Sequence, residues 1–275
     1  MFGNDNVRKF ISTYGRYLSI GISIDGTKEC HDLNRVDIHG NGTYDSIIPN
    51  LEFIRKHIPK NKISAKATFN HDTIKYYKDS IMHLIDLGFT DIVANTVYEE
   101  TWTEDDSFFI FNQLRDVADY LIDNGLENKI IIHQINKNGS NYKNSSLGLP
   151  KTNNHCGSCN YMFCLGDNDK IYGCQRFAAN MMYPIGHIDS ESNIIINNIG
   201  IIDEVSKQYT TYPKECFDCD FHTICGTCAT LPYELNIDVK ELFSRKMQCG
   251  FTKAVGYAQC YFAWRLEERK KENNL

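Results

Sequence analysis

The 275-residue sequence has no uncharged apolar run that approaches the ~18 residues needed to cross a bilayer, so it predicts no membrane-spanning protein. Its first five residues contain neither a basic nor an apolar segment, so we expect no secretory signal and a cytoplasmic protein. The chain also has no basic excess, because 29 Lys and Arg stand against 35 Asp and Glu and the formal net charge is −6. This balance argues against a nucleic-acid partner.

Cysteine is scarce in one part of the chain and abundant in another. Only Cys30 occurs in residues 1–136, whereas nine of the eleven cysteines fall between Cys156 and Cys249. Since no export signal is predicted, we expect these thiols to lie in a reducing compartment. Clustered cysteines there bind metals more often than they form disulfides.

The spacing of these cysteines predicts two metal centres. Residues 216–228 contain two C-x2-C pairs that are five residues apart. One such pair lets two sulfurs reach a single metal, but two pairs this close would crowd one centre, so we expect two sites of four thiolates each. Spacing alone leaves [4Fe–4S] clusters and structural zinc as alternatives. The candidate ligands are Cys156, Cys159, Cys164, Cys174, Cys216, Cys219, Cys225, Cys228 and Cys249, with Cys159 and Cys164 as alternatives for one position.

Residues 1–136 alternate short apolar segments with longer amphipathic ones. The expected strands are 18–24, 63–69, 91–97 and 130–132, and the expected helices begin at or near Thr43, Asp72 and Thr103. This alternation is typical of parallel βαβ units and predicts an α/β fold. Residues 137–154 are rich in Asn, Ser, Gly and Lys, which predicts a linker, and a further helix is expected at 250–271.

Several segments resemble radical S-adenosylmethionine (SAM) peptide-modifying enzymes. Residues 23–35 resemble their S-[IL]-D-G-x-x-E-x-H-D-x-x-R motif, and residues 42–45 resemble the G-T-[YF]-[DE] stretch that follows it. Residues 167–174 resemble the D-x-x-G-x-I-Y-P-C hairpin of the SPASM domain, and the order of the cysteines resembles that domain as well. Residues 95–103 are most similar to the peptide maturases associated with CXXX-repeat targets.

This resemblance implies a fold and a function. Residues 1–136 would form the C-terminal half of a partial parallel (β/α)6 barrel, 137–154 a linker, and 155–275 a SPASM domain with a C-terminal helix. The implied enzyme is an oxidoreductase that crosslinks or oxidises a ribosomally made peptide. Its implied cofactors are SAM, in the full-length enzyme, and two auxiliary [4Fe–4S] clusters that transfer electrons or anchor the substrate. A flavodoxin or ferredoxin would be its reductant.

The resemblance also divides the cysteines between the two clusters. The second cluster would be bound by Cys216, Cys219, Cys225 and Cys249. The first would be bound by Cys156, Cys174 and Cys228, together with Cys159 or Cys164, or else would keep an open iron site.

On the barrel side, the resemblance implies that Ser23 and Asp25 lie near the SAM carboxylate and ribose. Asn95 is a further candidate for SAM binding, and Glu99 and Glu100 are candidates for contact with a peptide.

Three features depart from the family pattern. The C-x3-C-x2-C loop and the G-G-E segment are absent, so we expect an N-terminal part to be missing, or to be supplied by a separate chain, and the chain alone to be inactive toward SAM. Gln175 occupies the position of an Asp base in relatives that oxidise sulfatases, so no catalytic base is identified. Asp169 replaces the hairpin glycine and must accept a left-handed turn. The alternatives are a non-catalytic iron–sulfur module for electron transfer or peptide binding, and a structural zinc protein.

Overall fold

The computed structural model describes residues 3–135, 157–160, 162–208, 214–222, 224–226 and 228–273, and the chain divides into two compact units. The first unit comprises Met1–Glu100, Glu104–Ser140 and Lys253–Leu275, and the second comprises Thr101–Thr103 and Asn141–Thr252. The expected linker at 137–154 lies outside the described residues, so the predicted domain boundaries stay a prediction.

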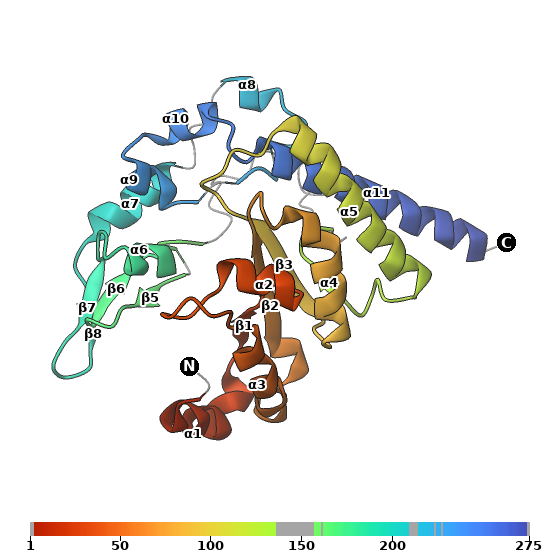
Figure 1. Cartoon of the computed structure of the whole chain (residues 1–275). Helices are drawn as coiled ribbons and strands as arrows, with labels where there is room; N and C mark the ends of the chain where they lie inside the picture. Colours follow the sequence, from red (N-terminus) through yellow and green to blue (C-terminus); the bar gives the residue numbers. More distant parts are fainter. Residues whose placement is uncertain are drawn as a thin grey trace. The chain divides into compact units, whose positions relative to one another are not determined.

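The first unit contains a parallel sheet in the order β1-β2-β3-β4 (Figure 1). Its strands are β1 (Ile20–Ser23), β2 (Ile63–Phe69), β3 (Asp91–Thr96) and β4 (Ile131–Ile132). The three pairings between neighbouring strands are all parallel, which confirms the predicted α/β fold. β2 has the predicted bounds, whereas the other three strands are shorter than expected.

The helices of this unit only partly follow the prediction. They are α1 (Asp5–Tyr14), α2 (Lys28–Asn34), α3 (Tyr44–His57), α4 (Tyr77–Asp86), α5 (Glu104–Asp123) and the part of α11 (Cys249–Asn273) that begins at Lys253. α3 and α5 begin where expected, but a 3₁₀ turn at Ile74–Tyr76 precedes α4, so that helix begins later than the predicted cap at Asp72. α2 was not predicted, because its seven residues are too few to show a periodic pattern. The Thr27 side chain caps it by accepting a hydrogen bond from Cys30 N–H at 3.3 Å.

One face of the sheet is apolar and covered by helices. Successive strands step in one direction and parallel crossovers are right-handed, so the connecting helices lie on the same face. Figure 1 shows α2, α4 and α5 in front of the sheet. Ala65, Ala67 and Phe69 of β2 are buried on this face. Tyr77 of α4 packs its ring against Phe69, with ring centroids 4.8 Å apart, and donates its hydroxyl to Ala94 O at 2.9 Å.

The opposite face of the sheet carries polar side chains. Side chains alternate along β2, so Lys66 and Thr68 point away from the helix-covered face. The register pairs Ser23 of β1 with Lys66 and Asn95 of β3 with Thr68. Ser23 and Lys66 are exposed, and Thr68 and Asn95 are half-buried. The two candidates Ser23 and Asn95 thus lie on one face, separated by two further polar residues.

Helix α11 packs against α5 within the first unit. The Tyr261 hydroxyl donates to Asp119 Oδ1 at 2.8 Å, and Arg265 Nε–H donates to the same oxygen at 3.0 Å. Gln259 Nε2–H donates to the carbonyl oxygen of Gln134, beyond β4, at 3.2 Å. The helix expected at 250–271 is therefore confirmed, and its polar contacts fix it to α5 and to the edge of the sheet.

The second unit contains an antiparallel sheet and short helices. Its strands, in the order β5-β6-β7-β8, are β5 (Cys164–Leu165), β6 (Lys170–Tyr172), β7 (Gly186–Ile188) and β8 (Ile194–Ile196). Its helices are α6 (Gln175–Ala179), α7 (Ile199–Gln208), α8 (Lys214–Phe217), α9 (Leu231–Leu235) and α10 (Val239–Ser244). A small core of Tyr172, Phe177, Ile185 and Val205 joins the sheet to the helices. The turn before β6 places Asp169 at φ +56°, the left-handed conformation that its sequence position requires.

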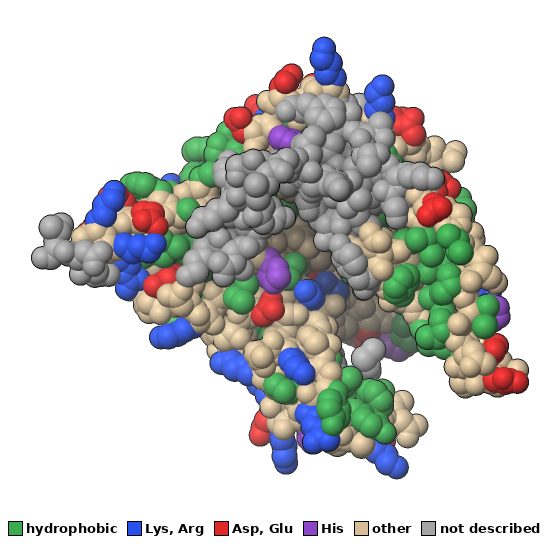
Figure 2. Space-filling model, turned by 180° about the vertical axis from the view of Figure 1, so that it is seen from behind, with side chains coloured by type: hydrophobic (Ala, Val, Ile, Leu, Met, Phe, Trp, Pro, Cys, Tyr) green, Lys and Arg blue, Asp and Glu red, His purple; other side chains and the backbone are tan. Residues whose placement is uncertain are grey.

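Exposed apolar side chains gather at two places in Figure 2. One is on α1 and the turn after it, where Phe10, Tyr14 and Tyr17 are exposed, and the other is on the β5–β8 sheet, whose edge strand β8 consists of three exposed isoleucines. Among the described residues, the helices lack the combination of length and hydrophobicity that a transmembrane segment needs.

Candidate functional site

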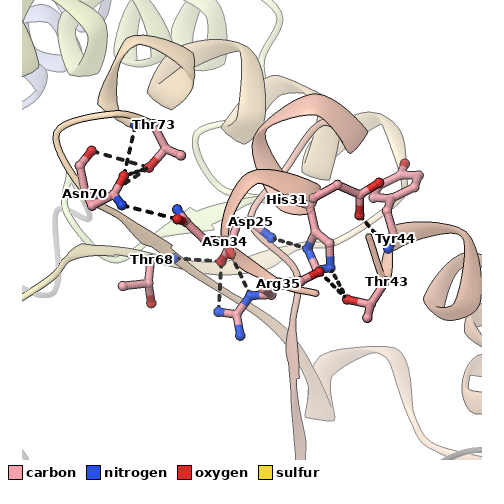
Figure 3. Close-up of polar contacts among 10 residues, drawn as sticks. Asp25, His31, Asn34, Arg35, Thr43, Tyr44, Thr68, Asn70 and Thr73 are labelled. Atoms are coloured by element: carbon pink, nitrogen blue, oxygen red, sulfur yellow. Dashed lines mark hydrogen bonds and ion pairs between the residues drawn. The ribbon is translucent and has the colours of Figure 1, made fainter. Parts of the chain in front are cut away.

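Asp25 follows β1 and is almost fully buried, at 2% exposure. Arg35, just beyond α2, donates to both of its carboxylate oxygens, from Nε–H to Oδ2 at 2.5 Å and from Nη2–H to Oδ1 at 2.9 Å (Figure 3). The backbone N–H of Thr68 in β2 donates to Oδ1 at 2.9 Å. Charge-assisted bidentate pairs of this kind are among the stronger polar contacts in proteins. The Asp25 carboxylate is thus engaged within the protein, which favours a positioning role over direct binding of a ligand.

His31 lies in α2 and is fully buried beside Asp25. Its Nδ1 accepts the backbone N–H of Asp25 at 3.2 Å, so the proton of the neutral ring belongs on Nε2, 3.0 Å from Thr43 Oγ1. The Thr43 hydroxyl donates in turn to Arg35 O at 2.9 Å. Burial lowers the pKa of His31 below its ordinary value. The neutral ring therefore joins α2 to the residue that precedes α3.

The loops that follow β2 and β3 are linked by His71 and Glu100. The His71 backbone N–H donates to Glu100 Oε2 at 2.8 Å, and His71 Nδ1 lies 2.6 Å from the same oxygen. Its Nε2 lies 3.5 Å from Asp106 Oδ2. Of the two carboxylates considered for a peptide, Glu100 is thus engaged by His71, and Glu99 is exposed. Ligands of βα barrels bind at the carboxyl ends of the strands, so these loops border the expected site.

Asn95 is held on the polar face by Gln134. Gln134 Nε2–H donates to Asn95 Oδ1 at 2.9 Å, and Gln134 Oε1 accepts Ala94 N–H at 3.1 Å. Three polar residues of this face, Lys66, Thr68 and Gln134, were not among the predicted site residues. The alternation of polar and apolar residues along β2 could have identified Lys66 and Thr68. Gln134 follows β4, and no sequence motif around it could have identified it.

Four thiols of the second unit are neighbours: Cys216, Cys219, Cys225 and Cys249. The pKa of Cys225 is raised to about 12, first by burial and then by the thiols of Cys249, Cys216 and Cys219. The pKa of Cys216 is raised by burial and by Cys249 and Cys219. Like-charged neighbours act in this way only at short range. The structure therefore brings together the four cysteines that the resemblance assigned to a second cluster.

A second group of cysteines surrounds Cys174. Its Sγ lies 3.4 Å from Thr230 Oγ1. Burial raises the pKa of Cys228, and Cys174 is one of its electrostatic neighbours. Cys159 is buried in the same apolar core as Cys174. Cys156, the fourth residue of this predicted group, lies outside the described residues.

Gly173 brings Cys159 beside Cys174. Cys159 N–H donates to Gly173 O at 3.0 Å, and a Cβ added at Gly173 would lie only 2.2 Å from Cys159 Sγ. Cys164 is half-buried in β5 instead, with its Sγ 3.6 Å from Leu165 O. Of the two alternatives left open by the spacing, the geometry favours Cys159.

Arg176 follows the position at which relatives that oxidise sulfatases carry a base. Arg176 Nε–H donates to Glu234 Oε1 at 2.6 Å, which ties α6 to α9, and the guanidinium partly opposes the rise that burial causes in the pKa of Cys228. Gln175, at that position itself, is exposed at the start of α6. Neither Gln175 nor Arg176 supplies a carboxylate base at this position.

Zinc and an iron–sulfur cluster place different geometric demands on four cysteines. Among the described residues, no three side chains of His, Cys, Asp or Glu are close enough to hold one metal ion. In a cubane cluster each of four thiolates binds a different iron, so the sulfurs lie farther apart than around zinc. The two kinds of centre therefore require different distances between the four sulfurs.

Two curated relatives match most of this chain, although no family model matches it. A serine-type anaerobic sulfatase-maturating enzyme of Bacteroides thetaiotaomicron is 23% identical over an alignment of 237 residues, and the match covers 76% of this chain and 54% of the relative. A cysteine-type anaerobic sulfatase-maturating enzyme of Clostridium novyi is 21% identical over an alignment of 221 residues, and that match covers 75% of this chain and 56% of the relative. The chain thus spans about half the length of the curated relatives it matches.

Solved structures of a related protein share the fold. Native anSMEcpe with bound AdoMet and Cp18Cys peptide superposes with a TM-score of 0.61 at 17% identity, over 93% of this chain and 73% of the other. Native anSMEcpe with bound AdoMet gives 0.60 at 16% identity, over 93% and 71%. The homologues of this chain are anaerobic sulfatase-maturating enzymes, which are radical SAM enzymes, and its parallel α/β sheet matches their fold.

Proposed function

We propose that this chain is part of a radical SAM enzyme that modifies a ribosomally made peptide, and that its second unit is a SPASM domain with two auxiliary [4Fe–4S] clusters. The observation that carries the proposal is the grouping of Cys216, Cys219, Cys225 and Cys249, four thiols from three separate stretches of the second unit. The relatives of this chain are radical SAM enzymes, which supports iron–sulfur chemistry at these four thiols.

The proposed ligands follow the two thiol groups. Cys216, Cys219, Cys225 and Cys249 bind one cluster, and Cys156, Cys159, Cys174 and Cys228 bind the other. Bound clusters of this kind supply electron transfer or a site at which a substrate group is anchored. The protein contributes thiolates, burial and the Arg176 guanidinium, all of which tune such a centre.

The polar face of the parallel sheet is the proposed SAM-binding surface. Ser23, Lys66, Thr68 and Asn95 offer hydroxyl, ammonium and amide groups there, and Asp25 and Gln134 position the strand ends that carry them. The sequence has no C-x3-C-x2-C loop, so we propose that the SAM-cleaving cluster comes from outside these residues. Among the described residues, β1 pairs on one side only, with β2, which leaves an edge for such a segment.

We propose a peptide substrate of the CXXX-repeat type. The relatives are named for sulfatase maturation, but Gln175 stands where such enzymes carry an Asp base, and the segment at 95–103 is similar to the CXXX-repeat maturases. A solved neighbour is described with a bound peptide, which supports a peptide as the substrate class.

Metal analysis after anaerobic purification and reconstitution tests the proposal. We expect about eight iron atoms and eight sulfides per chain, as two [4Fe–4S] clusters require. Stoichiometric zinc without iron would establish the structural zinc alternative instead. Incubation of the reduced protein with SAM should give no 5′-deoxyadenosine, and formation of that product would refute the proposal that the SAM-cleaving cluster lies elsewhere.

A further inference from the structure

The second unit contains a cavity of about 760 Å³, whose volume falls in the range of sites that bind small ligands and side chains. α9, α10 and the segment between them supply most of its lining, and Glu204 of α7 and Tyr183 complete it. All of its lining residues belong to the second unit. Neither the cysteine groups nor the polar face of the parallel sheet includes any of them, so the proposed function leaves this cavity unused.

One wall of the cavity is aromatic. The rings of Tyr183 and Tyr233 lie 5.0 Å apart between centroids, and both contact the buried ring of Phe177, at 6.5 and 5.5 Å. Phe177 thus holds the two tyrosines in place from below, while Tyr183 remains 47% exposed toward solvent. The faces of aromatic rings attract cations, because the π-system carries negative charge on its faces.

The remaining wall is acidic. Glu204, Asp238 and Glu241 line the cavity against a single basic residue, Lys240. Glu204 Oε1 accepts the Tyr233 hydroxyl at 3.1 Å, and Asp238 Oδ1 accepts the Glu241 backbone N–H at 2.7 Å. Both donors are neutral, so these hydrogen bonds position the two carboxylates without cancelling their charge. Glu241 is different, since its carboxylate pairs with Arg245 at 2.7 Å.

We propose that this cavity binds the cationic side chain of a lysine or arginine in a peptide. The aliphatic part of such a side chain packs on the tyrosine rings, and its charged end lies between the rings and the carboxylates of Glu204 and Asp238. Both attractions are stronger in a concave site, where the groups are partly shielded from water, than on a flat surface. An anionic side chain is repelled by the same carboxylates, and a neutral one gains only the apolar contact.

This inference rests on the proposed function for the identity of its ligand, because a peptide-modifying enzyme needs contacts that select its peptide. No cysteine lines the cavity, although Tyr233 packs against the core that contains Cys159 and Cys174. The cavity would therefore add a site that selects a basic residue of the peptide. Binding energy from such contacts is used to orient a substrate for reaction.

Calorimetric titration of the full chain with three blocked tripeptides tests the inference. The probes are acetyl-Gly-Arg-Gly-amide, the same peptide with citrulline, which has nearly the shape of arginine without its charge, and the same peptide with glutamate. We expect the arginine peptide to bind at least tenfold more tightly than the citrulline peptide, and the glutamate peptide not to bind. Equal binding of all three would overturn the proposal.

Two variants locate the binding. Glu204→Gln keeps an acceptor for the Tyr233 hydroxyl but removes the charge, so we expect affinity for the arginine peptide to fall about tenfold. Glu191→Gln, which removes one exposed charge from the turn between β7 and β8, is the matched control and should leave affinity unchanged. Equal losses in the two variants would show a general charge effect and no site in this cavity. The titration involves neither SAM nor turnover, so it does not depend on the proposed function. If the protein holds zinc but still binds the arginine peptide, the proposed function fails while this inference stands.

Discussion

Asp25, which is buried, and Arg35, which is half-buried, form a bidentate ion pair that joins the end of β1 to the end of α2. The backbone N–H of Thr68 completes the contacts of the carboxylate, so the same group also fixes β1 to β2. Figure 3 shows these contacts beside the hydrogen bonds of His31, within one network at the carboxyl end of the strands. The geometry of the proposed SAM surface therefore depends on a carboxylate that Arg35 and Thr68 engage within the protein.

Replacement of Asp25 tests this positioning role. Asp25→Asn removes the counter-charge of Arg35 while keeping an acceptor for Thr68 N–H, so we expect a loss of about 2 kcal/mol in the free energy of unfolding in urea. Arg35→Lys keeps the charge but not the bidentate geometry, and should cost less. A loss below ~0.5 kcal/mol for Asp25→Asn, the range of ordinary surface substitutions, would contradict the role.

Gly26 lies closer to helix α4 than a residue with a side chain could lie. It has φ +105°, and an added Cβ would lie 2.0 Å from the Cβ of Ser80 on α4. We expect Gly26→Ala to destabilise the protein by more than about 2 kcal/mol, because α4 would have to move away. Gly40 is the matched control, since it has φ +82° with nothing within 4 Å of an added Cβ. Gly40→Ala should cost only the backbone strain, about 1 kcal/mol, and equal thermal shifts in the two variants would show that the close approach is unimportant.

His31 makes stability dependent on pH. Its pKa is lower in the folded protein than the ordinary 6.5, mainly through burial, although Asp25 and Asp32 oppose the shift that Arg35 and Lys28 assist. The unfolded chain therefore takes up a proton first as the pH falls. The contribution of a neutral His31 is complete above about pH 6.5 and is lost below it, by at most about 1.4 kcal/mol per pH unit.

Urea unfolding at several pH values between 7.5 and 5.5 measures this dependence. His31→Gln keeps a polar side chain that does not titrate, so its free energy of unfolding should fall less steeply with decreasing pH than that of the unmodified protein. Parallel curves for the two proteins would rule out a contribution from His31.

The choice between Cys159 and Cys164 can be decided by iron content. If Cys159 is the ligand, Cys159→Ala should retain about four of about eight iron atoms per chain, and Cys164→Ala should retain all of them. Gly173→Ala should resemble Cys159→Ala, because its Cβ would displace the Cys159 sulfur. Cys260→Ala, at an exposed cysteine of α11, controls for the loss of a thiol alone. Loss of iron from Cys164→Ala but not from Cys159→Ala would reverse the assignment.

Local sequence patterns were sufficient to predict several of the strands and helices. The bounds of β2 were predictable because alternating small apolar and polar residues lie between turn-forming ends, and α5 because a long amphipathic segment follows Thr103 and ends before Gly125. α2 was not predictable, since its stability comes from the Thr27 cap and from the burial of Cys30 and His31 in the folded protein. A short helix stabilised by tertiary contacts has no periodic signal of its own.

The sequence by itself determined the number and order of the cysteines, the parallel βα pattern and the polar alternation that places Ser23 and Asn95 on one face, because these depend on composition and on residue spacing along the chain. Only the tertiary structure decided that Asp25 is engaged by Arg35, that Cys159 and not Cys164 lies beside Cys174, and that tyrosines and carboxylates from separate elements line one cavity. Those contacts join residues far apart in the chain or depend on the exact path of a turn. They arise only once strand register and helix packing have brought the groups within hydrogen-bonding or van der Waals distance.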